Sequence, residues 1–204
     1  TEYIYRAQVG KPIGYFYGMS YSGIWQNQAQ IDAARAAGTT VLDDAQPGDC
    51  IWDDWNNDGV ITYAEGDNCD RHEIGNPNPD VTLGINLGVN FKGIDFSVNG
   101  AGAFGMQIMR SYRSYGDTPY QNYDSTILGR WHGEGTSNSQ PKLSPSGHSN
   151  TIWVSNRYME DADYFKIKTV TLGYDLKSVW KNCPLQQLRF YAQVQNLYTF
   201  TGYT

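Results

Sequence analysis

The sequence predicts an all-β protein, an antiparallel up-and-down transmembrane β-barrel segment of about six strands that is a fragment of a larger barrel. Three observations lead to this fold class. Apolar and polar residues alternate strictly between Val81 and Phe91, short and long connections alternate along the chain, and the composition is rich in Tyr, Trp and Gly.

The stretch from Val81 to Phe104 carries the clearest strand signal. Every odd position from Val81 to Phe91 is apolar, and every even position is small or polar. A period of two places these two sets on opposite faces of a strand. About eleven residues is also the length with which a tilted strand crosses a bilayer core of about 30 Å. A turn at Lys92–Ile94 and a reversed alternation over 95–99 predict a hairpin.

Alternation alone does not say which face is inside. In a soluble β-sandwich the apolar face forms the core, whereas in an outer-membrane barrel it meets lipid. The other expected strands cover residues 3–9, 13–24, 164–176 and 188–200, with a bulge near Lys168–Thr169 where the apolar phase changes. A short helix is expected within residues 28–37.

The lengths of the connections favour the barrel. They run short at 10–12, long at 25–80, short at 92–94, long at 106–163 and short at 181–184. All short connections therefore lie at one end of the predicted sheet. Barrels have short periplasmic turns and long outer loops, and a sandwich has no reason to keep this asymmetry.

Composition excludes several classes of protein. The chain has 204 residues with 22 Gly, 16 Tyr and 6 Trp, and a net charge of -6. The negative charge argues against nucleic-acid binding, which needs clustered Lys and Arg. No apolar run approaches the roughly eighteen residues of a membrane-spanning helix. We find no signal peptide in the sequence, which opens in strand-like residues.

A metal-binding motif lies in the first long connection. Residues 54–65 match the twelve-residue EF-hand loop, with a glycine at Gly59 for the sharp turn. Hard oxygen ligands indicate Ca²⁺ first and Mg²⁺ second. The alternative is an Asx-rich turn without an ion. The predicted ligands are Asp54, Asn56, Asp58, the Val60 carbonyl, Thr62 and Glu65.

Cysteine spacing predicts a disulfide around the same loop. Cys50 and Cys69 bracket the motif, and a bond between them would remove unfolded-state entropy worth about 3 kcal/mol. Two unrelated thiols are the alternative. Cys183 is left over as a free thiol. Paired cysteines favour an oxidising compartment.

No catalytic constellation is found, so the sequence predicts no enzyme. Gly100–Gly105 fits a dinucleotide fingerprint by letter, but neither a helix nor a βαβ unit follows. Glu160, Asp161 and Asp163 indicate a solvated acidic loop rather than a hydrolase pair. The three histidines, His72, His132 and His148, share no metal-ligand spacing.

Several phrases together resemble the SusC/RagA family of TonB-dependent outer-membrane transporters. They occur in the family's order along nearly the whole chain: Gly10–Gly18, Gly23–Trp25, Pro47–Asp49, the Asp54–Gly59 loop, Ile74–Asp80, Arg130–Trp131 with Gly133–Gly135, Ser155–Asp161, Leu172–Tyr174 and Gln195–Thr199.

The resemblance implies that residues 1–204 belong to the C-terminal part of such a transporter's barrel domain, in a Gram-negative outer membrane. It implies import of nutrients, oligosaccharides or peptides, with a SusD-like surface lipoprotein as partner. The family's plug domain and its TonB-contacting segment have no counterpart in these residues, so contact with TonB is implied only through another part of the protein.

Orientation follows if the barrel interpretation holds. The short turns would be periplasmic and the two long loops outside the cell. Trp131, Tyr112, Tyr115 and Tyr120 would then offer surfaces to substrate or lipoprotein. The predicted lumen residues are Asn86, Asn90, Asn99, Gln193 and Gln195, and the predicted lipid-facing residues are Leu83, Ile85, Leu87, Val98, Phe190 and Val194.

The competing function is a secreted, calcium-stabilised β-sandwich that binds glycans through exposed Trp and Tyr. Such a module folds alone and stays soluble without detergent. A piece of a barrel does not, because its open edges and its apolar face need covering.

Overall fold

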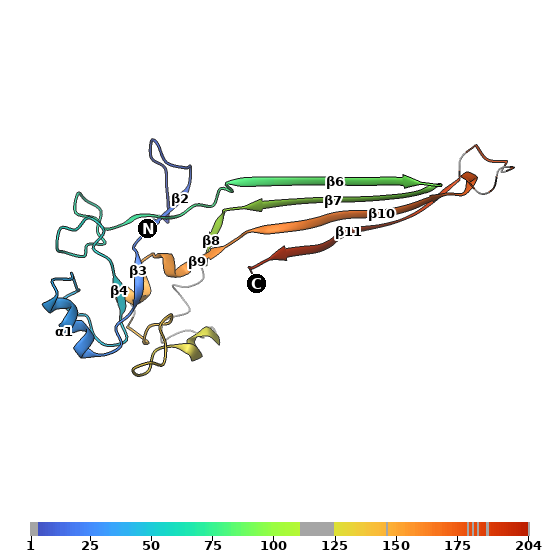
Figure 1. Cartoon of the computed structure of the whole chain (residues 1–204). Coiled ribbons are helices and arrows are strands. Elements are labelled where there is room, and N and C mark those ends of the chain that lie inside the picture. Colours follow the sequence, from blue (N-terminus) through green and yellow to red (C-terminus); the bar gives the residue numbers. More distant parts are fainter. Residues whose placement is uncertain are drawn as a thin grey trace. The chain divides into compact units, whose positions relative to one another are not determined.

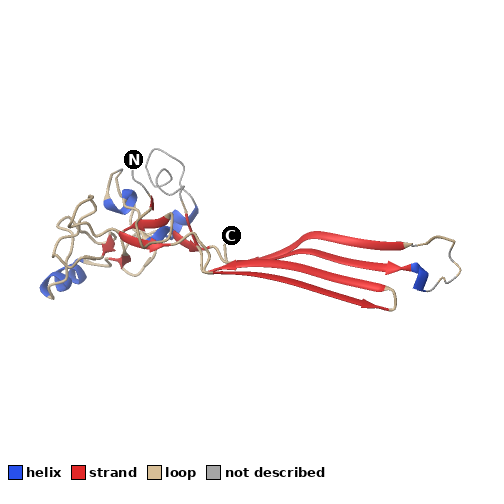
Figure 2. Cartoon of the chain, turned by 90° about the horizontal axis from the view of Figure 1, so that it is seen from above, coloured by secondary structure: helices blue, strands red, loops and turns tan. Residues whose placement is uncertain are grey.

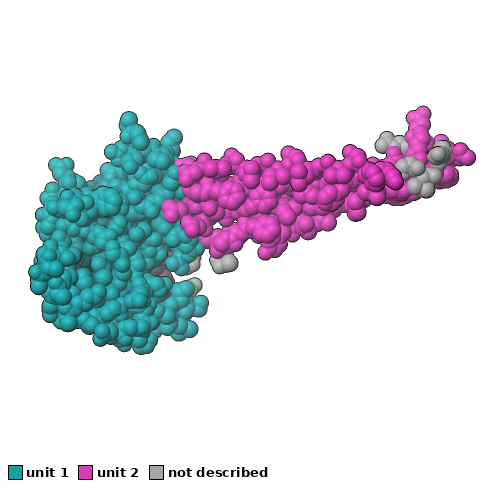
Figure 3. All heavy atoms as spheres, viewed as in Figure 1, with its two compact units in different colours: residues 1–77, 108–160 teal, residues 78–107, 161–204 magenta. Residues whose placement is uncertain are grey.

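A computed structural model describes residues 4–110, 125–145, 147–178, 180, 182, 184–186 and 188–203 (Figure 1). The chain divides into two compact units (Figure 3). The first unit comprises Thr1–Pro77 and Ile108–Glu160, and the second comprises Asn78–Gln107 and Asp161–Thr204.

The second unit is a four-stranded antiparallel sheet in the order β11-β10-β7-β6. Its long strands are drawn in red in Figure 2. Its strands are β6 (Val81–Phe91), β7 (Ile94–Phe104), β10 (Tyr164–Asp175) and β11 (Arg189–Thr201). All four were expected from alternation, and the limits of β6 agree with the sequence pattern. The β6–β7 turn places Lys92 and Gly93 at φ 48° and 85°, as a two-residue hairpin turn requires.

Each face of this sheet has one chemical character. Residues directly opposite one another in an antiparallel pair lie on the same face. Leu87, Val98, Val170 and Val194 form one such cross-strand row, and Asn86, Asn99, Thr169 and Gln195 form a row on the other face. All of β11 is exposed, as is all of β6 except the half-buried Ile85. The apolar face is therefore open to its surroundings.

A bulge keeps β10 in phase with its neighbours. Against β7, Ile167 and Thr169 oppose the consecutive residues Gly100 and Asn99, so Lys168 is the extra residue on that side. Against β11 the same two residues oppose Tyr198 and Gln195, so there the extra residue belongs to β11. Phe165 and Ile167 thereby share a face with Val170 and Leu172 although their sequence parity differs. The predicted bulge near Lys168–Thr169 is confirmed.

The glycines of β7 permit close packing against β10. A Cβ atom on Gly102 would lie 2.7 Å from the carbonyl oxygen of Tyr164, and one on Gly100 would lie 2.9 Å from the Phe165 ring. The Gly-rich letters that mimic a dinucleotide motif are therefore a strand packed against aromatic side chains.

Short strands and helices make up the first unit. A three-stranded sheet joins β1 (Tyr5–Arg6), β2 (Tyr15–Gly18) and β5 (His72–Gly75). β3 (Tyr21–Ile24) pairs with β4 (Cys50–Trp52), and β8 (Gln107–Met109) pairs with β9 (Met159–Asp161).

The expectation of one up-and-down sheet of about six strands is not confirmed, because the two N-terminal segments do not join the four-stranded sheet. Residues 13–24 break into β2 and β3, which pair in different sheets. Gly18 lies so close to the Val154 backbone that a Cβ would come within 2.6 Å of its carbonyl oxygen. Met19 then forms a bridge with Ser155. These contacts with a distant segment outweigh the local alternation.

The helices are short. α1 (Gln28–Ala36) confirms the expected helix; Asn27 caps it by accepting from Gln30 N–H, and Ile31 is buried beneath it. The others are η1 (Ser125–Gly129), α3 (Ser149–Ile152), η2 (Asn156–Tyr158) and η3 (Leu176–Ser178). Among the described residues, no helix has both the length and the apolar character needed to span a membrane.

Two apolar clusters and a buried polar network hold the first unit. Phe16, Met109, Val154 and Tyr158 form one cluster, and Met19, Cys50, Trp52 and Ile61 form the other. The Asn150 side chain accepts from Cys50 N–H at 3.0 Å and donates to Asp49 at 2.8 Å. The two long connections are therefore folded together rather than being separate loops.

Candidate functional site

The Asp-rich segment 54–65 folds into a tight turn built on side-chain oxygens. Asp54 Oδ2 accepts from Gly59 N–H at 2.9 Å and from the Thr40 hydroxyl at 2.7 Å. Asn56 Oδ1 accepts from Asp58 N–H, and Asp58 Oδ1 accepts from Val60 N–H, both at 2.9 Å. Gly59 has φ 86°, as the sharp turn of the motif requires.

These hydrogen bonds set the charge state of the turn. Burial by itself would raise the pKa of Asp54, but the hydrogen bonds from Thr40 and from the backbone of Gly59 and Asp58 outweigh it, so the pKa of Asp54 is lowered. The carboxylate is therefore held in the charged form that both hydrogen bonding and a cation favour.

Asp70 organises the loop and was missed by the sequence reasoning. Its side chain is completely buried. Oδ1 accepts from the N–H groups of Trp55 and Asn56 at 2.8 and 3.2 Å, and Oδ2 accepts from Thr62 N–H at 2.6 Å. The residue lies beyond the twelve positions of the motif, so the EF-hand template gave no signal for it.

The structure brings together part of the predicted ligand set. Asp54, Asn56 and Asp58 share one turn, whereas Glu65 is 72% exposed and pairs with Arg71 Nη2 at 3.5 Å. Thr62 gives its N–H to Asp70. Within the described part of the chain, no three or more His, Cys, Asp or Glu side chains are grouped as a metal site. Calcium binding stays a prediction.

The predicted Cys50–Cys69 disulfide is not formed, since both cysteines are free thiols. Cys50 lies in the apolar cluster with Met19 and Trp52, and burial raises the pKa of its thiol to about 12. Cys69 instead receives a hydrogen bond from Arg71 Nε at 3.5 Å. Each thiol has its own surroundings, so spacing in the sequence was a poor guide. Cys183 lies outside the described residues.

The remaining candidates have structural contacts. His72 stacks on Trp55, with ring centroids 3.6 Å apart, and Glu160 pairs with Arg110 at 2.7 Å. Asp163 accepts from Gly105 N–H at 2.8 Å. Trp131 packs over Gly48, where a Cβ would lie 2.5 Å from the indole ring. Tyr112, Tyr115 and Tyr120 lie outside the described residues.

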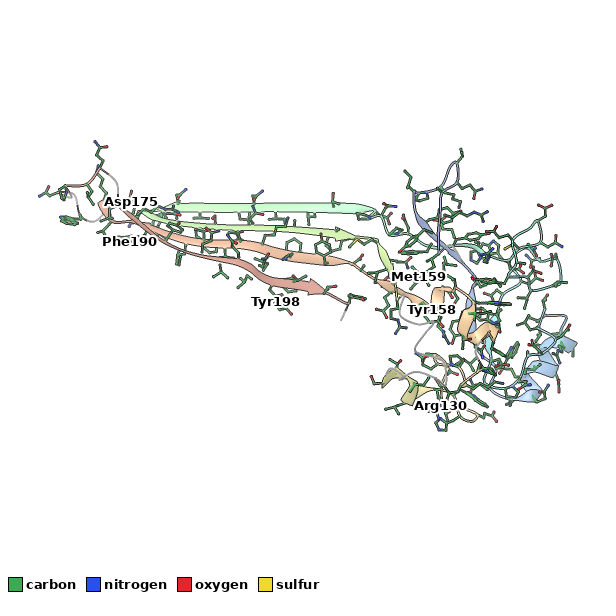
Figure 4. All side chains as sticks on the ribbon, turned by 180° about the vertical axis from the view of Figure 1, so that it is seen from behind. Arg130, Tyr158, Met159, Asp175, Phe190 and Tyr198 are labelled. Atoms are coloured by element: carbon green, nitrogen blue, oxygen red, sulfur yellow. The ribbon has the colours of Figure 1, made fainter. Side chains whose placement is uncertain are left out.

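The long sheet presents a second type of candidate surface. Aromatic side chains occur near both ends of its apolar face: Phe91, Tyr174 and Phe190 near the β6–β7 turn, and Phe165, Tyr198 and Phe200 near the other end. Phe190 and Tyr198 lie toward opposite ends of β11 (Figure 4). The Tyr198 and Phe200 rings meet edge to face at 4.7 Å.

The chain is similar in sequence to TonB-dependent receptors. No family model matches the chain. TonB-dependent receptor P3 of Formosa agariphila is 30% identical over 196 residues, which are 95% of this chain and 18% of that protein. TonB-dependent receptor SusC of Bacteroides thetaiotaomicron is 24% identical over 164 residues, or 79% of this chain and 15% of SusC. The chain thus spans less than a fifth of these relatives.

Solved structures show the same fold. A structure of the RagAB peptide importer in its open-open state superimposes with a TM-score of 0.63 at 21% identity. The match covers 96% of this chain and 20% of the RagAB chain. A closed-closed state matches with a TM-score of 0.59 at 20% identity. The relatives are receptors and transporters, which supports a role other than catalysis. The chain therefore fits a segment of a SusC/RagA-like TonB-dependent transporter.

Proposed function

We propose that this chain forms part of the β-barrel wall of a nutrient importer in a Gram-negative outer membrane. The observation that carries the proposal is the four-stranded sheet with one apolar and one polar face, both of them open. An apolar face this long needs a cover, and lipid supplies one on all strands at once.

The dimensions of the sheet support this interpretation. β6 and β7 have 11 residues each, and β10 and β11 have 12 and 13. Eleven residues extend about 37 Å, and a tilt of about 40° leaves about 28 Å across the membrane, close to the apolar band of known barrels. The aromatic residues near both ends of the apolar face match the two interfacial girdles of such barrels.

The polar face suits a water-filled lumen. Asn, Thr, Ser and Gln side chains line its cross-strand rows, as in Asn86, Asn99, Thr169 and Gln195. β6 and β11 are the two edges of this sheet. Further strands on both edges would close the barrel and satisfy the backbone groups that lipid cannot.

The direction of the strands gives the orientation. The Lys92–Gly93 turn and the segment between Asp175 and Arg189 lie at one end of the sheet. Both long connections join the sheet at its other end. Short turns are periplasmic in barrels of this kind, so the long connections would lie outside the cell.

Partners and substrate follow from the relatives. RagAB imports peptides, and that cargo is a property of RagAB. For this chain we propose a SusD-like lipoprotein on the extracellular side, TonB contact through another part of the protein, and an oligosaccharide or a peptide as cargo.

Labelling of intact cells tests the proposal. Single cysteines within residues 135–139 of the second long connection should react with a membrane-impermeant maleimide, whereas cysteines at Lys92 or Gly93 should react only after lysis. Equal labelling at both places would mean that no membrane separates them. In the rival sandwich, a second sheet would cover the apolar face and the isolated chain would be soluble without detergent.

A further inference from the structure

A cavity of about 750 Å³ opens in the first unit and is lined by residues of β1, β2 and β5 and the turns beside them. The charged residues on its wall are Arg6, Lys11 and Arg71 against the single carboxylate of Glu73. The whole chain carries a net charge of -6, so this cavity gathers positive charge in an acidic protein. Such a concentration attracts anions.

The cations differ in how far they are already neutralised. Lys11 Nζ lies 2.8 Å from Glu73 Oε2, and Arg71 pairs with Glu65 at 3.5 Å. Arg6 is exposed, and no ion pair joins it to another described residue. Its guanidinium lies 4.3 Å from the centre of the Tyr17 ring. That stacking holds the group in place while leaving its N–H donors for a ligand.

An aromatic platform lies in the wall of the same cavity. Trp55 stacks on His72 with an interplanar angle of 5°, yet 57% of the Trp55 surface is exposed. One indole face is therefore covered and held flat, and the rest of the ring is open. A flat apolar ring surface of this kind packs well against the C–H face of a sugar.

The other lining groups suit a ligand with many hydroxyls. The Tyr15 hydroxyl donates to Gln8 Oε1 at 3.2 Å, and both residues line the cavity together with the Lys11–Glu73 pair. A wall of this polarity gives hydrogen bonds to hydroxyl groups, whereas a peptide with apolar side chains would find few apolar contacts.

We propose that this cavity binds an acidic oligosaccharide, with its carboxylate or sulfate group on Arg6 and an adjoining sugar ring on Trp55. The inference rests on the proposed import function and narrows its cargo to negatively charged sugars. A planar guanidinium binds either anion through two parallel hydrogen bonds, so the site by itself fits both.

Binding to the intact protein, purified in detergent at low salt, tests the proposal by calorimetry. The probes are trigalacturonate, a sulfated galactose trisaccharide, neutral galactotriose and tri-glutamate. At least one acidic sugar should bind about tenfold more tightly than galactotriose, and Arg6→Gln should remove that preference. Trp55→Ala should weaken binding of every sugar. The acidic sugar that binds more tightly identifies the anion.

Arg35→Gln is the matched control. Arg35 lies in α1 outside the cavity wall and donates to the Leu42 carbonyl at 3.0 Å, so its loss removes one positive charge elsewhere in the unit. This variant should bind as the wild type does. Equal losses in Arg6→Gln and Arg35→Gln would overturn the inference, as would tighter binding of tri-glutamate than of either acidic sugar.

Uptake by cells separates this inference from the import proposal. Import of neutral sugars without any effect of Arg6→Gln on binding would overturn the cavity assignment alone. The opposite outcome is that the acidic sugar binds in a way that depends on Arg6 while its uptake by cells does not require this protein. That outcome would contradict import and leave the cavity assignment standing.

Discussion

The two units of this chain are stabilised by opposite means. In the four-stranded sheet most side chains are exposed, and order comes from backbone pairing between long strands. In the first unit the strands have two to four residues, and buried polar groups such as Asp70 and Asn150 tie down the backbone of distant segments. A sheet that meets lipid needs regular strands, because every backbone group must be paired. A folded set of loops in water can instead use side chains as backbone partners.

The largest expected effect is in the first unit. Asp70→Ala removes the acceptor for three backbone N–H groups and should destabilise the unit by about 3–5 kcal/mol, because each buried unpaired donor costs about 1–3 kcal/mol. Hydrogen exchange of residues 54–70 should increase sharply while exchange in β6 and β7 stays unchanged. Asp67→Ala, at an exposed position, is the control. Equal exchange in the two variants would contradict the role given to Asp70.

The faces of the sheet give the next test. Ile85→Arg should make folding into bilayers less favourable by about 2–4 kcal/mol if this position lies near mid-membrane, and Asn86→Arg should be tolerated. The two positions are adjacent in β6 and point to opposite faces. Folding into lipid vesicles, followed by a shift in gel mobility, measures both. A similar loss in both variants would mean that the polar face does not line water.

Glycines sharpen the same comparison within one sheet. Gly102→Ala should cost about 1–3 kcal/mol, because the new methyl group would lie 2.7 Å from the Tyr164 carbonyl oxygen. Gly84→Ala meets no atom within 4 Å and should be neutral or slightly stabilising. Urea unfolding from vesicles compares the two. A destabilised Gly84→Ala variant would show that β6 is crowded on that face by something outside this chain.

Calcium should have the smallest effect, since Asp70 already holds the loop. Millimolar Ca²⁺ should slow proteolysis within residues 54–65 by a few fold, as a weak extracellular site would. Asp58→Ala should abolish this protection, whereas Asp43→Ala, outside the motif, should keep it. If proteolysis proceeds at the same rate with Ca²⁺ and with chelator, the motif is an Asx-rich turn.

The sequence predicted the features that depend on neighbouring residues and missed those that depend on residues far along the chain. The strands of the long sheet follow from their own alternation, and even the bulge at Lys168 was visible as a change of phase. The prediction for the N-terminal strands was not confirmed, because Gly18 and Met19 contact residues 154 and 155, far along the chain. The role of Asp70 and the free thiols of Cys50 and Cys69 were not predicted for the same reason, because tertiary contacts set their surroundings.

The pairing of β7 with β10 has a consequence for the order in which the molecule forms. β6 and β7 are separated by a two-residue turn, whereas β7 and β10 meet across the long segment 105–163. Closing so long a segment costs more chain entropy than closing a hairpin. We therefore expect the β6–β7 and β10–β11 hairpins to appear early, and their joining to be the slow event. Until then each hairpin exposes an unpaired edge, so the chain is most prone to aggregate during this interval.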